Sequence, residues 1–321
     1  MKPINIGIIG CSAIANKTVL PSIKNSNLFN LVMVGSRSEE KGKTFADNFD
    51  CDFGSYEDVL NHEGIDAIYV SVPTGLHYEW GMRVLEAKKH LLLEKPFTAT
   101  IEQAKEIIER ALSDNLIAME GLAYVYHPYF IELQKLLNKN VIGKVRSLES
   151  SFGFPSLPLT DIRNQSDIGG GAILDNLIYP LSVCLSLLGN DYERKSYKIQ
   201  YNNILNIDER GYLRLDWAEC SANIVYGFGF SYKNIIEIWG SAGTITVDRA
   251  FTKPADMKAI IAVKTNEGTH DIEVEAVNQF EHMLTGFYQK ISGEDASSKN
   301  EKNDILNRMD IISEMYYNRH N

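Results

Sequence analysis

A short apolar segment near the start of the chain, followed by a turn of small residues, constrains the fold more than any other feature. The segment Ile4–Ile9 has the length and apolar character of a buried strand, and a helix-like pattern follows the turn. Gly10, Ser12 and Ala15 stand where a dinucleotide-binding turn has its three small residues. In that turn the first makes the bend, the second lets the backbone approach a pyrophosphate, and the third lets the helix pack on the strand. The second glycine is missing, but the segment still predicts a Rossmann turn.

The end of the second predicted strand indicates which dinucleotide is bound. In NAD-binding folds an acidic residue stands there, roughly 20 residues beyond the glycines, and binds the ribose 2′-hydroxyl. Here the run Leu31–Val34 leads to Ser36 and Arg37, and the first acid, Glu39, comes only after the turn. A hydroxyl and a guanidinium suit a 2′-phosphate, although Arg37 could also be a solvated loop cation. The pattern favours NADP(H) over NAD.

The first 120 residues alternate strand and helix patterns, as a parallel sheet requires. Ligands in such sheets bind outside the carboxyl ends of the strands, and several further polar residues fall at such ends. One of them, His77, could line the pocket or simply cap the next helix. The predicted cofactor-binding residues are Gly10, Cys11, Ser12, Ala13, Ile14, Ser36, Arg37, Pro73, Thr74, His77, Glu94 and Lys95.

The length and the later patterns predict a second domain. Single cores stop growing near 250–300 residues, and the chain has 321. From about Val145, short runs rich in β-branched and aromatic residues suggest an open, mostly antiparallel sheet. A helical stretch from Gly171 to Leu188 interrupts the series, and a polar connector, Ser292–Asn303, separates two closing helices. The predicted fold is α/β, with a Rossmann domain over residues 1–123 and an α+β substrate-binding and oligomerisation domain over residues 124–321.

Charge and composition limit the partners. The net charge of −10, from 32 basic and 42 acidic residues, argues against nucleic acid or an anionic membrane as a partner. The four cysteines are scattered without metal-ligand spacing, as in a reduced cytoplasmic protein, and we expect no metal. No signal peptide precedes the first strand, and no apolar run reaches the roughly 18–20 residues of a membrane helix.

Five motifs carry a family resemblance. They are Gly10-Cys11-Ser12-x-Ile14-Ala15, Ser36-Arg37, Pro73-x-x-x-His77, Glu94-Lys95-Pro96 and Gly169-Gly170-Gly171-x-x-x-Asp175-x-x-x-Tyr179-Pro180. In this order they resemble the glucose-fructose oxidoreductase/inositol dehydrogenase/rhizopine catabolism family over essentially the whole chain. Tyr179 stands where many relatives have His, which resembles the branch of dihydrodiol dehydrogenases, NADP-dependent aldose dehydrogenases and nucleotide-sugar 3-ketoreductases. The segment from Gly240 to Pro254 is most similar to ketoreductases of deoxysugar pathways.

Three side chains are candidates for hydride-transfer chemistry. Reduction of a carbonyl needs a proton donor and a group that stabilises the developing alkoxide. A Tyr beside a Lys can supply both, so we assign these roles to Tyr179 and Lys95. Asp175 shares a helix face with Tyr179 and could orient Lys95 or bind a substrate hydroxyl. Taken singly, the three could be a surface lysine, an exposed helical acid and a core aromatic. Arg163 could contact a substrate hydroxyl or phosphate, or be a solvated loop residue.

Two functional classes follow. The first is an NADP(H)-dependent oxidoreductase, and the resemblance implies reduction of a nucleotide-linked 3-keto deoxysugar. Oxidation of a free aldose or of a trans-dihydrodiol is the alternative within this class. The second is a non-catalytic NADP-sensing regulator that keeps the fold but not the activity. Because an exposed sheet rich in Val, Ile, Tyr and Phe is a liability, we expect a homodimer or homotetramer through the C-terminal sheet.

Overall fold

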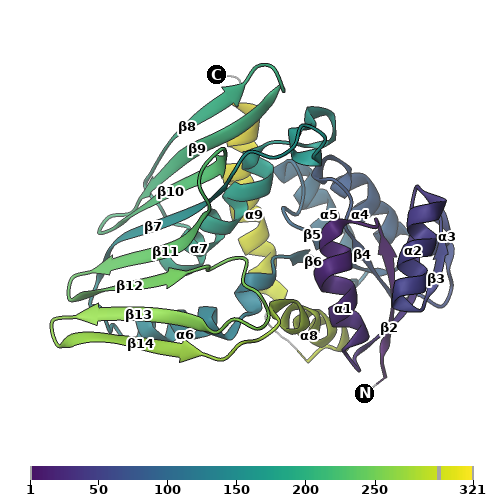
Figure 1. Cartoon of the computed structure of the whole chain (residues 1–321), viewed down its shortest axis with the longest axis horizontal. Helices are drawn as coiled ribbons and strands as arrows, with labels where there is room; N and C mark the ends of the chain where they lie inside the picture. The colour runs from purple at the N-terminus through teal and green to yellow at the C-terminus, as the bar shows by residue number, and fades with distance from the viewer. Residues whose placement is uncertain (1, 295–297, 320–321) are drawn as a thin grey trace. The chain divides into compact units, whose positions relative to one another are not determined.

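The computed structural model describes residues 2–294 and 298–319. The chain forms two compact units, which are described separately (Figure 1). The first consists of Met1–Ala123 with Phe280–Met309, and the second of Tyr124–Gln279 with Asp310–Asn321. The sequence predicts one domain from residue 124 onward, whereas in the structure the segment Phe280–Met309 belongs to the first unit.

The first unit is built on a parallel sheet. Within the described residues the sheet has six strands in the order β3-β2-β1-β4-β5-β6, which is the strand order of a Rossmann fold. The strands are β1 (Ile4–Ile9), β2 (Phe29–Gly35), β3 (Asp52–Gly54), β4 (Ala67–Val70), β5 (His90–Glu94) and β6 (Ala118–Gly121). They alternate with α1 (Leu20–Lys24), α2 (Glu39–Phe49), α3 (Tyr56–Asn61), α4 (His77–Glu86) and α5 (Ile101–Ser113).

Local sequence explains where these elements begin. All four residues of β4 are buried, as expected for a strand covered on both faces. Helices α2, α3 and α5 each begin after a hydroxyl residue, namely Ser38, Ser55 and Thr100, whose side-chain oxygen accepts a backbone N–H of the first turn.

Helix α8 (Gln279–Ser292) and the first part of α9 (Ser298–Tyr317) complete the first unit. Phe287 of α8 stacks on Phe29 of β2, with ring centroids 6.3 Å apart. The connector predicted over Ser292–Asn303 is shorter than expected, because α9 already begins at Ser298. Residues 295–297 of that connector lie outside the described residues.

The second unit is built on a mostly antiparallel sheet, as predicted. Within the described residues it has eight strands in the order β14-β13-β12-β11-β7-β10-β9-β8, and β7 and β10 form its parallel pair. The strands are β7 (Val145–Phe154), β8 (Arg194–Asn202), β9 (Ile207–Asp216), β10 (Ser221–Phe228), β11 (Lys233–Gly240), β12 (Gly243–Asp248), β13 (Ala259–Thr265) and β14 (Gly268–Val274). The edge strand β14 is mostly polar and exposed, so its sequence does not predict a strand.

One face of this sheet is covered by helices. Helix α7 (Ile178–Leu188) contacts β7 and β10, and α6 (Pro128–Asn138) contacts β13 (Figure 1). The other face, which we call the open face, carries partly or fully exposed side chains, including Trp239 at 66% exposure. A π-helical turn, Ile173–Leu177, runs directly into α7, so the predicted helix from Gly171 to Leu188 is present with a wider first turn. Among the described residues, no helix is both long and apolar enough to cross a membrane.

Candidate active site

The turn after β1 has the geometry of a phosphate-binding turn. Gly10 has φ +101°, and a Cβ atom there would lie 2.8 Å from the carbonyl oxygen of Ser71, so only glycine fits. The Ser12 hydroxyl accepts the N–H of Ala15 at 3.1 Å and so caps the helical segment that follows. Ala13 and Ile14 are exposed beside it. A backbone free of side chains next to a helix N-terminus suits a pyrophosphate.

The turn after β2 lies beside the first turn. The Gly10 N–H donates to the Gly35 carbonyl at 3.1 Å, and the Cys11 thiol is 3.8 Å from the same oxygen. Burial raises the pKa of the Cys11 thiol, and Ser36 partly offsets that shift. Arg37 follows, exposed to solvent. Glu39 is not at the strand end: it lies in the first turn of α2 and pairs with Lys43 at 2.6 Å.

Tyr56 lies close to Arg37 and is not among the residues predicted from the sequence. Burial raises the pKa of Tyr56, and the nearby Arg37 guanidinium partly offsets this shift. The Tyr56 ring also packs edge-on against Trp80, with centroids 4.7 Å apart, and the Arg83 guanidinium lies over Trp80 at 4.6 Å. Tyr56 follows β3 at the carboxyl edge of the sheet, so the strand-end rule could have found it.

His77 lies under the strand ends. It is 1% exposed, with Nδ1 2.8 Å from the Pro96 carbonyl oxygen and Nε2 2.9 Å from the Val72 carbonyl oxygen. Burial lowers the pKa of His77 to about 4. The ring therefore ties the loop after β4, which contains Pro73 and Thr74, to the loop after β5. Contact between His77 and the cofactor stays a prediction.

The loop that carries Lys95 is held by a buried carboxylate. The Glu94 side chain is 8% exposed and accepts the Tyr69 hydroxyl at 2.5 Å and the Lys95 backbone N–H at 3.2 Å. Burial raises the pKa of Glu94, while the Tyr69 hydroxyl and the Lys95 charge act in the opposite direction. The backbone of Lys95 is thus fixed from β4 as well as from its own strand.

A second buried carboxylate holds the same loop from the other side. Glu120 of β6 accepts the Phe97 N–H at 2.7 Å and pairs with Arg308 of α9 at 2.6 Å. Both charged side chains are at most 7% exposed. Because the carboxylate has a guanidinium and a backbone donor, its burial is compensated. Neither Glu120 nor Tyr69 was predicted, since both lie inside strands that read as plain core.

In the second unit, Asp175 is held by an arginine. The Arg163 Nε donates to Asp175 Oδ2 at 2.8 Å, and its Nη1 lies 3.2 Å from Asp161 Oδ1. The Asp175 charge, followed by that of Asp161, raises the pKa of Arg163. The Asp175 side chain is 17% exposed. Arg163 is therefore an ion-pair partner of the predicted catalytic acid and not a solvated loop residue.

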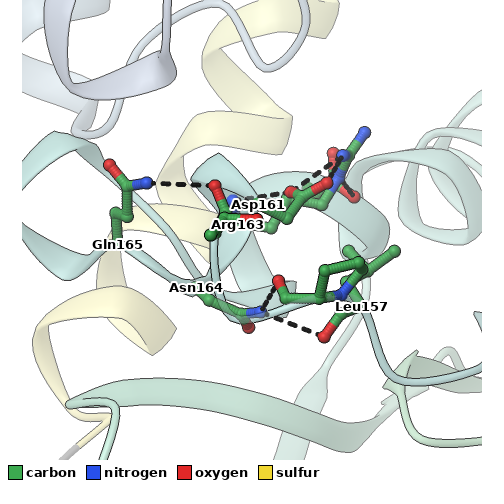
Figure 2. A network of polar contacts seen from close by, with 8 residues as sticks. Leu157, Asp161, Arg163, Asn164 and Gln165 are labelled. Carbon is green, nitrogen blue, oxygen red and sulfur yellow. Dashed lines mark hydrogen bonds and ion pairs between the residues drawn. The ribbon is translucent and has the colours of Figure 1, made fainter.

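The loop around Arg163 is braced by its own polar side chains (Figure 2). Asn164 Nδ2 donates to the carbonyls of Leu157 at 3.4 Å and Pro158 at 2.8 Å, and Gln165 Nε2 donates to that of Thr160 at 3.3 Å. The Gly171 N–H donates to the Arg163 carbonyl at 2.9 Å. The glycine motif thus packs on this loop.

Tyr179 lies in the first turn of α7 within an aromatic cluster. Its ring centroid is 4.9 Å from that of Phe152, 5.5 Å from Phe251 and 6.4 Å from Tyr124. The residue is nevertheless only half-buried. Three packed rings fix the direction of the side chain, as a positioned proton donor requires.

The strand-end turns fit a nicotinamide dinucleotide. The first turn offers a glycine cradle and a capped helix start, and the second offers a hydroxyl and a guanidinium without a competing carboxylate. In the part of the chain that the structure describes, no group of three or more His, Cys, Asp or Glu side chains has metal-binding geometry. The fold and these turns define a dinucleotide-binding protein with a second domain.

Comparison with known proteins places the chain in a family. Residues 4–122 match the model of the oxidoreductase family with an NAD-binding Rossmann fold (GFO/IDH/MocA), and residues 130–246 match the GFO/IDH/MocA C-terminal domain. The chain belongs to this family, which confirms the resemblance, the fold class and the prediction of an oxidoreductase.

Two curated relatives are similar over most of the chain. The dTDP-3,4-didehydro-2,6-dideoxy-alpha-D-glucose 3-reductase of Saccharopolyspora spinosa is 33% identical over 299 residues, covering 90% of this chain and 88% of the relative. The protein of the same name from Actinomadura kijaniata is 32% identical over 295 residues, covering 91% and 89%. A solved structure, KijD10, a 3-ketoreductase from Actinomadura kijaniata in complex with NADP and TDP-benzene, has a TM-score of 0.91 and 30% identity, covering 97% of this chain and 96% of that one.

Proposed function

We propose that this protein is an NADP(H)-dependent ketoreductase that reduces the 3-keto group of a nucleotide-linked deoxysugar, with a dTDP-linked sugar as the first candidate. The main support for this proposal is the near full-length similarity to two 3-reductases of dTDP-linked sugars. The KijD10 complex, which contains NADP and a TDP derivative, supports the same cofactor and nucleotide. The Ser36-Arg37 turn supports NADP(H) independently of the relatives.

The proposed chemistry assigns one role to each candidate residue. Bound NADPH supplies hydride to the carbonyl carbon. Tyr179 donates its phenolic proton to the carbonyl oxygen, and the Lys95 ammonium stabilises the negative charge that develops on that oxygen. Asp175, held by Arg163, accepts a hydrogen bond from a sugar hydroxyl and orients the ring. In this proposal Arg163 acts on the substrate through Asp175.

A panel of substrates tests the proposal. NADPH oxidation is followed with a dTDP-linked 3-keto deoxysugar, and NADP⁺ reduction with xylose, glucose and a trans-dihydrodiol. We expect kcat/KM for the nucleotide-linked ketosugar to exceed the others by about 10²-fold or more, because only that substrate uses the nucleotide contacts. A preference for a free aldose or a dihydrodiol would establish the alternative activity. Binding of NADPH without turnover of any substrate would establish the regulator.

We also propose that the open face is the interface between two copies of this chain. Glu149 of β7 and Glu237 of β11 stand directly opposite each other on it, an unfavourable pair in an isolated sheet. They line a hollow of about 250 Å³ together with Trp239. Arg214 of β9 is in the same cross-strand row and could meet this acidic pair from a second copy. Charge complementarity and an exposed Trp both favour a symmetric partner.

Light scattering at micromolar concentration tests the assembly. We expect a dimer or a tetramer for the unmodified protein and a smaller species for Trp239→Asp. The matched control is Ile131→Asp on α6, which replaces a side chain of 47% exposure outside the open face and should leave the mass unchanged. A monomeric unmodified protein would refute the interface. The cytoplasmic location and the absence of nucleic-acid and membrane partners stay predictions.

A further inference from the structure

A carboxylate that plays no part in the proposed chemistry lies buried at the start of the helix that carries Asp175 and Tyr179. Asp208, in β9, is 0% exposed. Its Oδ2 accepts the backbone N–H of Ile173 at 2.6 Å, and the neighbouring Ala172 N–H also favours the charged carboxylate. These are the first backbone donors of the helical segment, which have no partner within the helix. Asp208 therefore caps this helix from a strand 35 residues further along the chain.

The contact is too close for the residue before the helix to be anything but glycine. Gly171 has φ +116°, and a Cβ atom there would lie 2.3 Å from Asp208 Oδ1. Among the described residues that oxygen has no hydrogen-bond partner. Backbone and carboxylate are thus packed directly on each other, which fixes the position at which the π-helical turn Ile173–Leu177 begins. Asp175 lies within that turn, and Tyr179 follows one turn later.

Burial and hydrogen bonding act on the pKa of this carboxylate in opposite directions. Burial raises the pKa of Asp208 to about 6, against the opposing effect of the helix N–H groups and Arg319. Among the described residues, three tyrosines from different elements also interact with it: Tyr226 of β10, Tyr201 of β8 and Tyr316 of α9. None of these phenols titrates near pH 6, so a proton taken up there resides on Asp208.

We propose that Asp208 is a positioning residue, whose ionised carboxylate holds the first turn of the Asp175–Tyr179 helix in the arrangement that supports catalysis. This inference rests on the proposed function, because it assigns Asp208 an effect on turnover through those two side chains. A negative charge at a helix N-terminus stabilises that turn, and a proton on the carboxylate removes the stabilisation. Turnover should therefore fall as Asp208 becomes protonated at mildly acidic pH.

The test replaces Asp208 with its neutral isostere. We expect Asp208→Asn to lower kcat by about 10- to 100-fold, the scale of a small displacement of catalytic groups, and to leave the NADPH Kd unchanged within about twofold. We expect kcat of the unmodified enzyme to fall as the pH drops below about 6, and this fall should flatten in the variant. Asp191→Asn, at an exposed position after α7 in the same unit, should match the unmodified enzyme throughout. A folded Asp208→Asn enzyme with normal kcat and a normal pH profile would overturn the proposal.

A second measurement needs neither turnover nor the variant. Fraying of this turn withdraws the helix N–H groups from Asp208 but leaves the carboxylate buried in β9, so protonation favours the frayed state. Hydrogen exchange of the segment 171–179 in the unmodified protein, corrected for the intrinsic pH dependence of exchange, should therefore be at least about tenfold faster at pH 5 than at pH 7.5, while segment 128–138 of α6 should not differ. Equal protection of segment 171–179 at both pH values would contradict the proposal even if the variant does not fold. Failure of the proposed function would instead appear as absent turnover in the unmodified enzyme, with this exchange pattern intact.

Discussion

The loop that carries Lys95 and the side chain of Asp175 are held in place by different means. Two buried carboxylates, Glu94 and Glu120, accept hydrogen bonds from the backbone of the Lys95 loop, so the support is dry and short-ranged. Asp175 instead depends on Arg163, whose side chain is 38% exposed. Exposed ion pairs are weak and screened by salt, whereas buried, hydrogen-bonded ones are costly to break. The Lys95 loop of the first unit is therefore held rigidly, whereas the position of the Asp175 side chain in the second unit depends on an ion pair.

The largest effect on turnover should come from Lys95, on the loop that the two buried carboxylates hold. Lys95→Ala removes the charge that stabilises the forming alkoxide but leaves Glu94 and Glu120 in place, so the fold should be unaffected. We expect kcat to fall by about 10³-fold or more, with the melting temperature unchanged within a few degrees. Steady-state kinetics and calorimetry on the same sample check this. A loss of less than tenfold would remove Lys95 from the proposed chemistry.

Tyr179→Phe tests the proposed proton donor. The variant keeps the ring contacts with Phe152 and Phe251 and loses the proton donor, so kcat should fall by about 10²- to 10⁴-fold while the NADPH Kd is preserved. Asp175→Asn should be milder if Asp175 only binds a sugar hydroxyl. If Tyr179→Phe retained more than about a tenth of kcat, a loss below about 1.4 kcal/mol, the proton would have to come from Lys95 or the ligand.

The Arg163–Asp175 pair predicts a dependence on salt that the Lys95 loop should not share. Arg163→Ala removes the ion pair with Asp175, and we expect kcat/KM for the ketosugar to fall by about 10- to 100-fold. Arg163→Lys should lie between the unmodified enzyme and Arg163→Ala. Raising the ionic strength from about 0.05 to about 0.5 M shortens the Debye length to below roughly 10 Å and screens this ion pair. It should therefore lower kcat/KM of the unmodified enzyme and leave kcat/KM of Arg163→Ala unchanged. Identical salt profiles would show that the pair does not affect substrate binding.

Tyr69→Phe tests the buried support of the Lys95 loop. Burial raises the pKa of Glu94, so the protonated form is favoured in the folded protein and stability is lost as pH rises through the shifted range. The Tyr69 hydroxyl opposes this by donating to the carboxylate. Its removal should cost about 1–3 kcal/mol at neutral pH and less at pH 4.5, where Glu94 carries its proton more often. Denaturant unfolding at the two pH values measures the difference, and an equal cost at both would contradict a charged Glu94.

The smallest effect concerns the cofactor. NADPH should bind at least about tenfold more tightly than NADH, a difference of about 1.4 kcal/mol, and Arg37→Ala should erase most of that preference while NADH binding stays nearly the same. Fluorescence titration gives both affinities. Equal affinities in the unmodified protein would show that the Ser36-Arg37 turn does not recognise a 2′-phosphate.

The sequence predicts the features that depend on neighbouring residues better than those that depend on distant contacts. The strand ends of the first unit are local features, so Gly10, Arg37 and the Glu94-Lys95 pair could be found from spacing alone. The strand patterns of the second unit also predicted its sheet, except for the polar edge strand β14.

The features that the sequence did not predict depend on contacts between residues far apart in the chain. Asp208 caps a helix 35 residues before it, and Arg308 reaches Glu120 across 188 residues. The segment Phe280–Met309 joins the first unit through contacts that no local periodicity encodes. A carboxylate inside a strand pattern gives no sign of the distant partner that compensates its burial.

The proposed reduction at C3 of the sugar is tested most directly by following the hydride. The enzyme is incubated with NADPH deuterated at the transferred position and a dTDP-linked 3-keto deoxysugar, and the product is examined by NMR spectroscopy and mass spectrometry. We expect one deuterium per molecule, bound to C3 of a sugar that remains attached to the nucleotide, with one equivalent of NADP⁺ formed. Deuterium at another carbon, or consumption of the sugar without incorporation, would contradict it.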